Sequence, residues 1–598
     1  MLERKGFNLP IDFLTNKQLL DEHVHNDLEL NTTDPTASLY NYVFNATTPF
    51  GKGTLPLWNK HYTTDIAFLK DTQQFLKVKK VKKENKSTDA NTDANEATEI
   101  SPELQEKIKK IAHEIKNETG FAERYSYIEW GRLSFLNNNS SFLQCLSVYN
   151  MASPVFSLLL PIFFLILPLI IIKFSKMPIT IDKYIELLKV TFKKHQLGQI
   201  FNLAGASFEK TIYVFGSLVF YVIQIYQNIM SCRKFYQNMS KIHDNLFTMR
   251  DYLSTTLKNM EVLIDKCKGY KTYEPFIAAM KEHKTVCENL YADYKTISPY
   301  KVSMKKVGEI GHLMKCFYQL NKNEEVYDTL QYTIGLNGFI DNINGLRKNI
   351  SLKQVCACKF KSPGGKKKSS LSAVTAFKDA YFPALVNNSP VKNTYKLDKH
   401  LLITGPNAAG KTTLLKTTLF NIIISQQIGY GFYKKATIVP YDMIHCYINI
   451  PDTSGRDSLF QAEAKRGKDI LTKIEENETS SANFRHFCVF DELYSGTNPY
   501  EAISSAYAYL KYLNKSDNVN FVLTTHFLDL CKRLEKEARM HNYHMRIDTD
   551  AEKEDFKYTY KMEKGISEIK GGIKVLKDLE YPAEIIDITR KTIKELIL

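Results

Sequence analysis

The feature that most constrains the fold is an apolar run that leads directly into a glycine-containing turn, Leu401-Leu-Ile-Thr-Gly-Pro-Asn-Ala-Ala-Gly-Lys-Thr-Thr413. This order predicts a strand, a loop and the start of a helix, where backbone N–H groups can surround a polyphosphate. Lys411 would add a positive charge near the outer phosphates, and the Thr412 hydroxyl would be a ligand for Mg²⁺. The stretch predicts a nucleotide-binding loop, with an ordinary glycine turn as the alternative.

Two further apolar runs end in polar residues, Phe487-Cys-Val-Phe-Asp491-Glu492 and Phe521-Val-Leu-Thr-Thr525-His526. If both are strands of an open parallel sheet, their carboxyl ends meet at the edge where the loop lies. We expect Asp491 to hold Mg²⁺ through water, Glu492 to polarise the attacking water and His526 to contact the terminal phosphate.

Together these residues resemble the ATPase domain of the MutS family of DNA mismatch-repair proteins. The loop is similar to the family's GPNMGGKS, residues 491–497 to its DELGRGT, and Thr525-His526-Phe527 to its THY. The resemblance covers roughly residues 375 to 595. Other elements that match in order are Phe382-Pro383, Val391-Lys-Asn393, Gln427-Ile-Gly429, Val439-Pro440, Tyr560-Lys561, Gly565, Gly572-Ile-Lys-Val575 and Pro582.

The resemblance implies an α/β P-loop ATPase of the ABC and MutS type with a mostly parallel sheet. It implies that ATP and Mg²⁺ are bound, that Thr412 and Asp491 hold the metal, and that Glu492 and His526 serve hydrolysis. The residues expected to contact ATP are Gly405, Pro406, Asn407, Ala408, Ala409, Gly410, Lys411, Thr412 and Thr413.

A second expectation from the resemblance concerns Asp457-Ser458-Leu-Phe460-Gln-Ala-Glu463, which is similar to the family's signature, an Asp followed by STFMVEM. By this likeness Ser458 would reach the nucleotide of a second protomer, which implies a homodimer formed through the ATPase domain. The alternative for Ser458 is an ordinary helix cap.

The chain departs from the family pattern at several positions. Ala408 and Ala409 stand in place of Met and Gly, Tyr494 and Ser495 in place of Gly and Arg, and Leu459 in place of Thr. None of these changes removes a group that nucleotide chemistry needs. Because Tyr494 and Ser495 lie where the family's subunits signal to each other, we expect altered communication with hydrolysis retained.

Composition adds broad limits. The 598 residues are enough for several domains, and an apolar content of 44% can supply their cores. The formal net charge of +15 favours DNA or an acidic membrane face as a partner, although a solvated lysine-rich surface explains it equally well. The 10 cysteines are scattered, which favours free thiols in a reducing intracellular compartment.

The pattern along the chain predicts seven regions. They are a small N-terminal region (1–75), a disordered lysine-rich linker (76–104), a helical region (105–150), two apolar helices (151–232), a helical lever-like domain (233–360), a flexible linker (361–370) and the MutS-like ATPase domain (371–598).

The two apolar segments, 155–172 and 211–230, contain no charged residue. They are long enough for a membrane hairpin that would leave the ATPase on the cytosolic side. The connecting segment opposes translocation, because Lys173, Lys176, Lys183, Lys189, Lys193, Lys194 and Lys210 outnumber Asp182, Glu186 and Glu209. A segment pair that dips in and returns, and a buried helix pair, therefore remain as alternatives.

Two functions are compatible with these patterns. The first is an ATP-dependent DNA-binding switch in mismatch repair or a related DNA transaction. The second is a membrane-associated ATPase motor or scaffold without mismatch recognition. Phe121-Ala-Glu123 matches the letters of the family's mismatch-reading F-x-E motif, but no mixed α/β domain surrounds it, so we do not expect it to act as a wedge.

Overall fold

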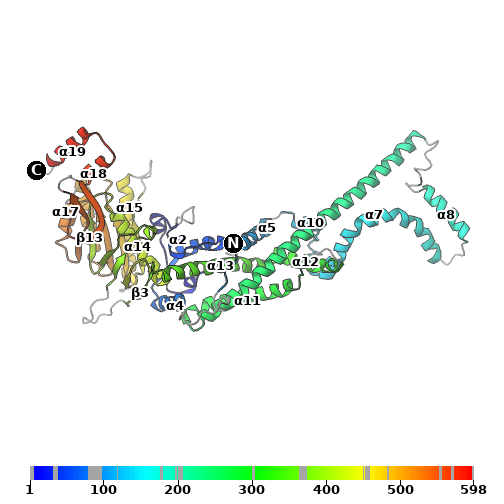
Figure 1. Ribbon diagram of the computed structural model, residues 1–598, viewed down its shortest axis with the longest axis horizontal. Coiled ribbons are helices and arrows are strands. Elements are labelled where there is room, and N and C mark those ends of the chain that lie inside the picture. Colours follow the sequence, from blue (N-terminus) through cyan, green and yellow to red (C-terminus); the bar gives the residue numbers. More distant parts are fainter. Residues whose placement is uncertain are drawn as a thin grey trace, which may run out of the picture. The chain divides into compact units, whose positions relative to one another are not determined.

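The computed structural model divides into two compact units, which are described separately and coloured along the chain in Figure 1. The helical unit contains Ile100–Lys258 and His283–Gln331, and the sheet unit contains Lys5–Glu99, Asn259–Glu282 and Tyr332–Leu598. The structure describes residues 6–30, 38–77, 97–117, 119–174, 180–194, 198, 207–298, 304–362, 374–448, 450, 458–480, 484–550, 555–567 and 571–595.

The main sheet of the sheet unit has six strands in the order β13-β12-β6-β11-β10-β9. All neighbouring pairs are parallel except β12 with β13, so the expected mostly parallel sheet is present. The strands are β6 (His400–Thr404), β9 (Met443–Tyr447), β10 (His486–Asp491), β11 (Val519–Thr525), β12 (Met540–Asp550) and β13 (Asp555–Lys564).

Burial explains why these strands form without polar alternation. Every residue of β6 is buried, as is every residue of β10 except Asp491. Continuous apolar runs are typical of parallel strands that are covered on both faces. The helices that follow the strands in the sequence are α14 (Lys411–Ile428), α15 (Leu459–Ser480), α16 (Pro499–Leu513) and α17 (Leu528–Leu534).

A second, five-stranded sheet has the order β5-β4-β8-β3-β7 and lies in the same unit. Its strands are β3 (Cys356–Phe360), β4 (Ala376–Ala380), β5 (Asn393–Lys396), β7 (Tyr430–Gly431) and β8 (Lys435–Ile438), and the tail forms α18 (Gly572–Asp578) and α19 (Ala583–Glu595). Asn393 joins the two sheets, because its side chain donates to the Tyr560 carbonyl at 3.0 Å and accepts from the Met562 N–H at 2.9 Å.

The N-terminal residues are not a separate region, as the sequence pattern suggested, but part of the sheet unit. Their elements are η1 (Pro10–Phe13), β1 (Lys17–Leu19), α1 (Glu22–Asp27), α2 (Leu39–Phe44), α3 (Pro49–Thr54), η2 (Leu55–Asn59), β2 (His61–Thr63) and α4 (Ile66–Leu76). These elements contact the end of α14. The buried Gln427 amide donates to the carbonyls of Trp58 (2.7 Å) and His61 (2.9 Å) and accepts from the Tyr40 hydroxyl (3.0 Å).

The helical unit is built from long helices. They are α5 (Pro102–Asn117), α6 (Phe121–Arg124), α7 (Ser140–Phe174), α8 (Ile181–Lys194), α12 (Met304–Lys322) and parts of α10 (Phe208–Cys267), α11 (Glu274–Lys295) and α13 (Glu324–Ser351). Phe121 is a core residue, with its ring stacked on Tyr127 and tilted against Phe317 at centroid distances of 5.3 and 5.5 Å. Its burial agrees with the expectation that it is no wedge.

Four expected boundaries fall inside helices. Those after residues 75 and 104 lie near the ends of α4 and α5. The boundary after residue 150 lies within α7, and the boundary after residue 232 lies within α10, which continues from the apolar segment into the polar one. Composition changes at these points because the surroundings of the helix change, whereas the backbone hydrogen bonding does not. Most of the two expected linkers, 76–104 and 361–370, lies outside the described residues.

The contacts of Gln427 generate a stability prediction. Gln427→Leu removes the hydrogen bonds to two carbonyls and one buried phenol, so we expect the free energy of unfolding to fall by about 2–4 kcal/mol. Tyr40→Phe removes only one of the three hydrogen bonds and is expected to cost about 1 kcal/mol. Urea denaturation measures both values, and equal stability of the two variants would contradict this account.

Candidate functional site

The loop between β6 and α14 has the shape that the sequence predicts. Gly410 caps the helix with a φ of 92°, and Ala408 also lies in the left-handed region with a φ of 64°. Glycine is favoured at position 410 by its positive φ, and a Cβ there would also lie 3.1 Å from the Tyr560 ring, which would have to shift slightly. Ala409, which replaces a glycine of the family pattern, has no positive φ and tolerates its methyl group.

Lys411 lies folded back on the loop. Its ammonium group donates to the carbonyls of Gly405 at 2.8 Å and Pro406 at 3.1 Å. Burial lowers the pKa of Lys411, while the nearby carboxylates of Glu492 and Asp491 act in the opposite direction. The side chain is therefore a desolvated cation whose present partners are two neutral carbonyls, which an anion in the loop could replace.

Asp491 at the end of β10 is held by hydroxyl groups from two other elements. Thr412 at the start of α14 donates to one carboxylate oxygen at 2.8 Å, and Thr524 on β11 donates to the other. The structure thus brings together Thr412 and Asp491, the two residues expected at the metal. A hydroxyl and a carboxylate oxygen are ligands that suit Mg²⁺.

Glu492 and His526 also come together, at the ends of neighbouring strands. Nδ1 of His526 lies 3.6 Å from Oε1 of Glu492, and both side chains are partly exposed. The interaction with His526 lowers the pKa of Glu492, and the charge of Lys411 contributes in the same direction. Glu492 has a φ of 52°, an uncommon conformation for a non-glycine residue that turns the chain at the strand end.

A cavity of about 410 Å³ opens beside these residues. Four of the expected site residues line it: Asn407, Thr412, Asp491 and Glu492. The remaining lining residues are Tyr447, Ile448, Ile450, Leu459, Glu463 and Ser495. Of the other expected contacts, Lys411 and Gly405 adjoin the cavity through the loop, and Thr413 lies exposed on the first turn of α14.

Ser458 is a helix cap in the single chain. Its hydroxyl accepts from the Gln461 N–H at 3.3 Å, and the Gln461 side chain accepts from the Ser458 N–H at 2.9 Å. This reciprocal pair is a capping box at the start of α15. Ser458 does not line the cavity of its own chain, whereas the next residue, Leu459, does. Asp457 lies outside the described residues.

Glu463 has a role that the sequence pattern did not assign. The side chain is 3% exposed, and its carboxylate accepts from the N–H groups of Ser495 (3.2 Å) and Gly496 (3.0 Å) and from the Ser495 hydroxyl (3.1 Å). It therefore fixes the loop after Glu492 to α15, the helix that Ser458 caps. The sequence signal for Glu463 was its match to the Glu of the family's signature segment, and that match did not identify the backbone groups that its carboxylate accepts from.

Comparison with known protein families finds a match in the C-terminal third of the chain. Residues 401–597 match the protein family described as MutS domain V. This segment is a MutS domain V. The DNA mismatch repair protein MutS of Persephonella marina is 30% identical over 207 residues, which are 33% of this chain and 22% of that protein. The MutS protein homolog 4 of mouse is 30% identical over 238 residues, 37% of this chain and 24% of that protein.

The human MutS protein homolog 4 is similar to the same extent, 31% identical over 223 residues, which are 35% of this chain and 23% of that protein. The chain thus matches about a quarter or less of the length of these relatives. The matched part contains the loop, both acidic residues and His526, so the site described above lies wholly within the MutS domain.

Tyr494 occupies a position where the MutS pattern has glycine, and its φ is 58°. A side chain in this left-handed conformation costs about 1 kcal/mol. The ring compensates through edge contacts with Tyr447 and Tyr509, at centroid distances of 6.5 and 5.9 Å. The Tyr494 hydroxyl oxygen lies close to Gly467 of α15. A Cβ at position 467 would be only 2.8 Å from this oxygen. Side-chain packing therefore holds this loop at a position where the MutS pattern has glycine.

This arrangement predicts an order of stability. We expect Tyr494→Ala to lower the free energy of unfolding by about 3–5 kcal/mol, because the ring contacts are lost while the strained φ remains. Tyr494→Gly loses the same ring but relieves the strain of the left-handed φ, so it should be about 1 kcal/mol more stable than the alanine variant. Thermal or urea denaturation measures the difference, and an alanine variant as stable as the glycine variant would show that φ is unstrained.

The Glu463 contacts generate a further prediction. Glu463→Gln keeps the shape but presents an NH₂ group to one of the backbone N–H donors, so we expect a loss of about 1–3 kcal/mol in stability. The rate of backbone amide hydrogen exchange should increase at Ser495 and Gly496, whose N–H groups donate to Glu463. Glu476→Gln, an exposed change on the same helix, is the matched control. Unchanged exchange at both amides would mean that Glu463 does not hold the loop.

Proposed function

We propose that this protein is a MutS-like ATPase that uses ATP binding and hydrolysis as a switch in DNA mismatch repair or a related DNA transaction. The observation that carries the proposal is the meeting of Thr412, Asp491 and Glu492 at one cavity at the carboxyl edge of the sheet. Ligand sites of open parallel sheets lie at this edge.

The loop is suited to a triphosphate. In this proposal the phosphates lie at the N-terminus of α14, where the helix dipole and backbone N–H groups favour negative charge. Lys411 exchanges its two carbonyl partners for phosphate oxygens. The buried ammonium group then has charged partners in place of neutral ones, which is more favourable. Gly405, Pro406, Asn407, Ala408, Ala409, Gly410, Thr412 and Thr413 form the remainder of the phosphate contact.

The same site fits Mg²⁺. Thr412 and Asp491 would hold the ion, since their side-chain oxygens already lie 2.8 Å apart. The bound ion would neutralise charge on the outer phosphates. Thr524 keeps Asp491 oriented from the opposite side, because it donates to the second carboxylate oxygen.

Glu492 and His526 have the chemistry that hydrolysis of ATP to ADP and phosphate requires. The lowered pKa keeps Glu492 ionised near neutral pH, so its carboxylate can accept a hydrogen bond from water and orient that water toward the terminal phosphate. His526, at 3.6 Å from Glu492, is placed to contact the terminal phosphate.

We further propose that the domain acts as a homodimer in which Ser458 contacts the nucleotide of the partner protomer. Two observations support this assignment. Ser458 begins α15 at the side of the cavity where Leu459 lies, and Glu463 on the same helix holds the loop that follows Glu492. A partner's nucleotide at the helix start could therefore act on the hydrolytic residues through one helix.

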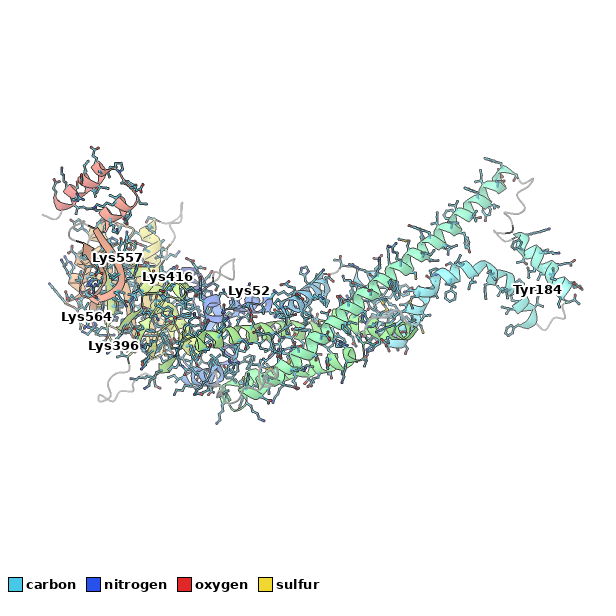
Figure 2. All side chains as sticks on the ribbon, viewed as in Figure 1. Lys52, Tyr184, Lys396, Lys416, Lys557 and Lys564 are labelled. Carbon is cyan, nitrogen blue, oxygen red and sulfur yellow. The ribbon has the colours of Figure 1, made fainter. Side chains whose placement is uncertain are left out.

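DNA is the partner that the charge and the relatives favour. The net charge is +15, and the matched bacterial proteins are named DNA mismatch repair proteins. Lysines of the sheet unit are spread over several elements, including Lys396 on β5, Lys416 on α14 and Lys557 and Lys564 on β13 (Figure 2). A phosphate backbone would attract such a surface, with an affinity that falls steeply with salt.

The hydrolytic assignment is tested by Glu492→Gln. We expect turnover of ATP to fall by about 10²–10⁴-fold, because the base is lost, while binding of ATP with Mg²⁺ is retained. Lys411→Ala should instead lose binding itself. Glu501→Gln, a change at an exposed carboxylate on α16, is the control and should hydrolyse ATP normally. Unaltered turnover in Glu492→Gln would refute the assigned base.

The DNA assignment is tested with the same protein. Duplex DNA, with and without a mismatch, should change the rate of ATP turnover in low salt, and the effect should weaken as salt is raised. An ATPase rate that is indifferent to DNA at every salt concentration would remove DNA from the proposal and leave the ATPase in place.

A further inference from the structure

Two apolar helical segments of the helical unit are exposed along most of their length. Only 11% of Ser140–Leu159 is buried, and only 6% of the apolar part of Thr211–Cys267. Individual side chains follow the same pattern, with Phe156, Ile162 and Phe220 exposed by 56%, 51% and 75%. An apolar helix in the core of a soluble unit would instead be mostly buried. These segments therefore lack the cover that their composition requires.

The exposed apolar surface of α7 is broad. Val155, Phe156, Leu158 and Leu159 lie within little more than one turn of α7, and all four are about half exposed. Because successive residues point about 100° apart, these side chains cover an arc of about 160°, and Ser157 lies on the other side, where it bonds to α10. The face of α7 that points away from α10 is therefore wholly apolar over this turn, which suits contact with lipid.

The polar groups within the apolar segments find partners in each other. Tyr221 of α10 donates from its hydroxyl to the Ser157 carbonyl of α7 at 3.2 Å, and the Asn228 amide donates to the Ser157 hydroxyl. The Cys232 thiol lies 3.6 Å from the Met151 carbonyl. Hydrogen bonds of this kind between helices satisfy polar groups that lipid cannot.

The prolines of α7 also favour a lipid environment for this helix. Pro154, Pro161 and Pro168 lie inside α7, yet the helix runs unbroken from Ser140 to Phe174. Prolines are more frequent within membrane helices than within soluble ones, and the backbone groups that they free are satisfied there by neighbouring helices and Ser or Thr side chains. The apolar stretches end at Lys173 in α7 and at Arg233 in α10, so basic residues flank both.

The helix between the two segments has a different character. On α8, the spacing of Ile181, Ile185, Leu188 and Phe192 places four apolar residues on one face. Lys183, Lys189 and Lys193 fall on the opposite face together with Asp182 and Glu186. Figure 2 labels Tyr184 on this helix, at the margin of the apolar face. A short amphipathic helix with a basic face is suited to the headgroup region of a membrane.

We propose that the apolar segments of α7 and α10 insert into a lipid bilayer, with α8 lying in the headgroup region. The 18 residues 155–172 of α7 would extend about 27 Å as a helix, which is close to the thickness of the hydrocarbon layer. The lysines of α8 favour anionic headgroups. This proposal is independent of the ATPase, because none of its residues belongs to the MutS domain.

The test is flotation of the full chain with vesicles of phosphatidylcholine, with and without phosphatidylserine. We expect the protein to float with both vesicle types, to remain bound through washes with high salt and alkaline carbonate, and to bind more rapidly when phosphatidylserine is present. The variant Ile162→Lys/Phe220→Lys places two charges at the middle of the apolar segments, and its bound fraction should fall by about 100-fold or more.

Tyr236→Lys is the matched control, because Tyr236 is 51% exposed on α10 but lies beyond Arg233. It should float like the unchanged protein, and all variants should keep their ATP turnover if the fold is intact. Release by salt would show a peripheral electrostatic contact and overturn the proposal. A detergent-free, soluble oligomer that does not float would also overturn it, since a second copy would then cover the apolar surface.

Discussion

The architecture of the candidate site depends on one carboxylate. Asp491 ends β10, and its two oxygens are held by hydroxyls from the first turn of α14 and from the neighbouring strand β11. Three elements that are distant in the sequence are thereby fixed at one sheet edge. The left-handed turn at Glu492 follows at once, and Glu463 then ties the next loop to α15. Residues from several elements at this sheet edge line the cavity, so no single loop forms it alone.

The helix α14 joins this edge to the N-terminal residues. Its first turn supplies Lys411 and Thr412, and its last turn supplies Gln426 and Gln427, whose amides bind the backbone around Trp58, His61 and Thr63. A helix of 18 residues is about 27 Å long. The N-terminal elements therefore complete the burial of the helix that follows the glycine-containing loop, which explains why they belong to the same unit as residues more than three hundred positions later.

The central sheet and the meeting of site residues could be predicted from sequence because both depend on local pattern. Apolar runs in β6, β10 and β11 end in Gly405, Asp491 and His526, and parallel pairing brings such ends together. The contacts of Gln427 and Glu463 could not be predicted, since a buried amide or carboxylate shows no periodicity and its partners are chosen by the fold. The boundaries at residues 150 and 232 were wrong because a change of composition does not end a helix. For Ser458, the cap is confirmed in one chain, and the contact with a second nucleotide stays a prediction.

The 60 residues of α10 contain no proline, and this continuous helix passes from the apolar segment to polar, amphipathic turns. Such a rod measures about 90 Å from end to end. Stiff elements of this length act as levers in the mechanical sense. A tilt of about 5° at one end moves the other by roughly 8 Å, from the length above. In a straight helix of this length, small angular changes would thus become displacements larger than a helix turn.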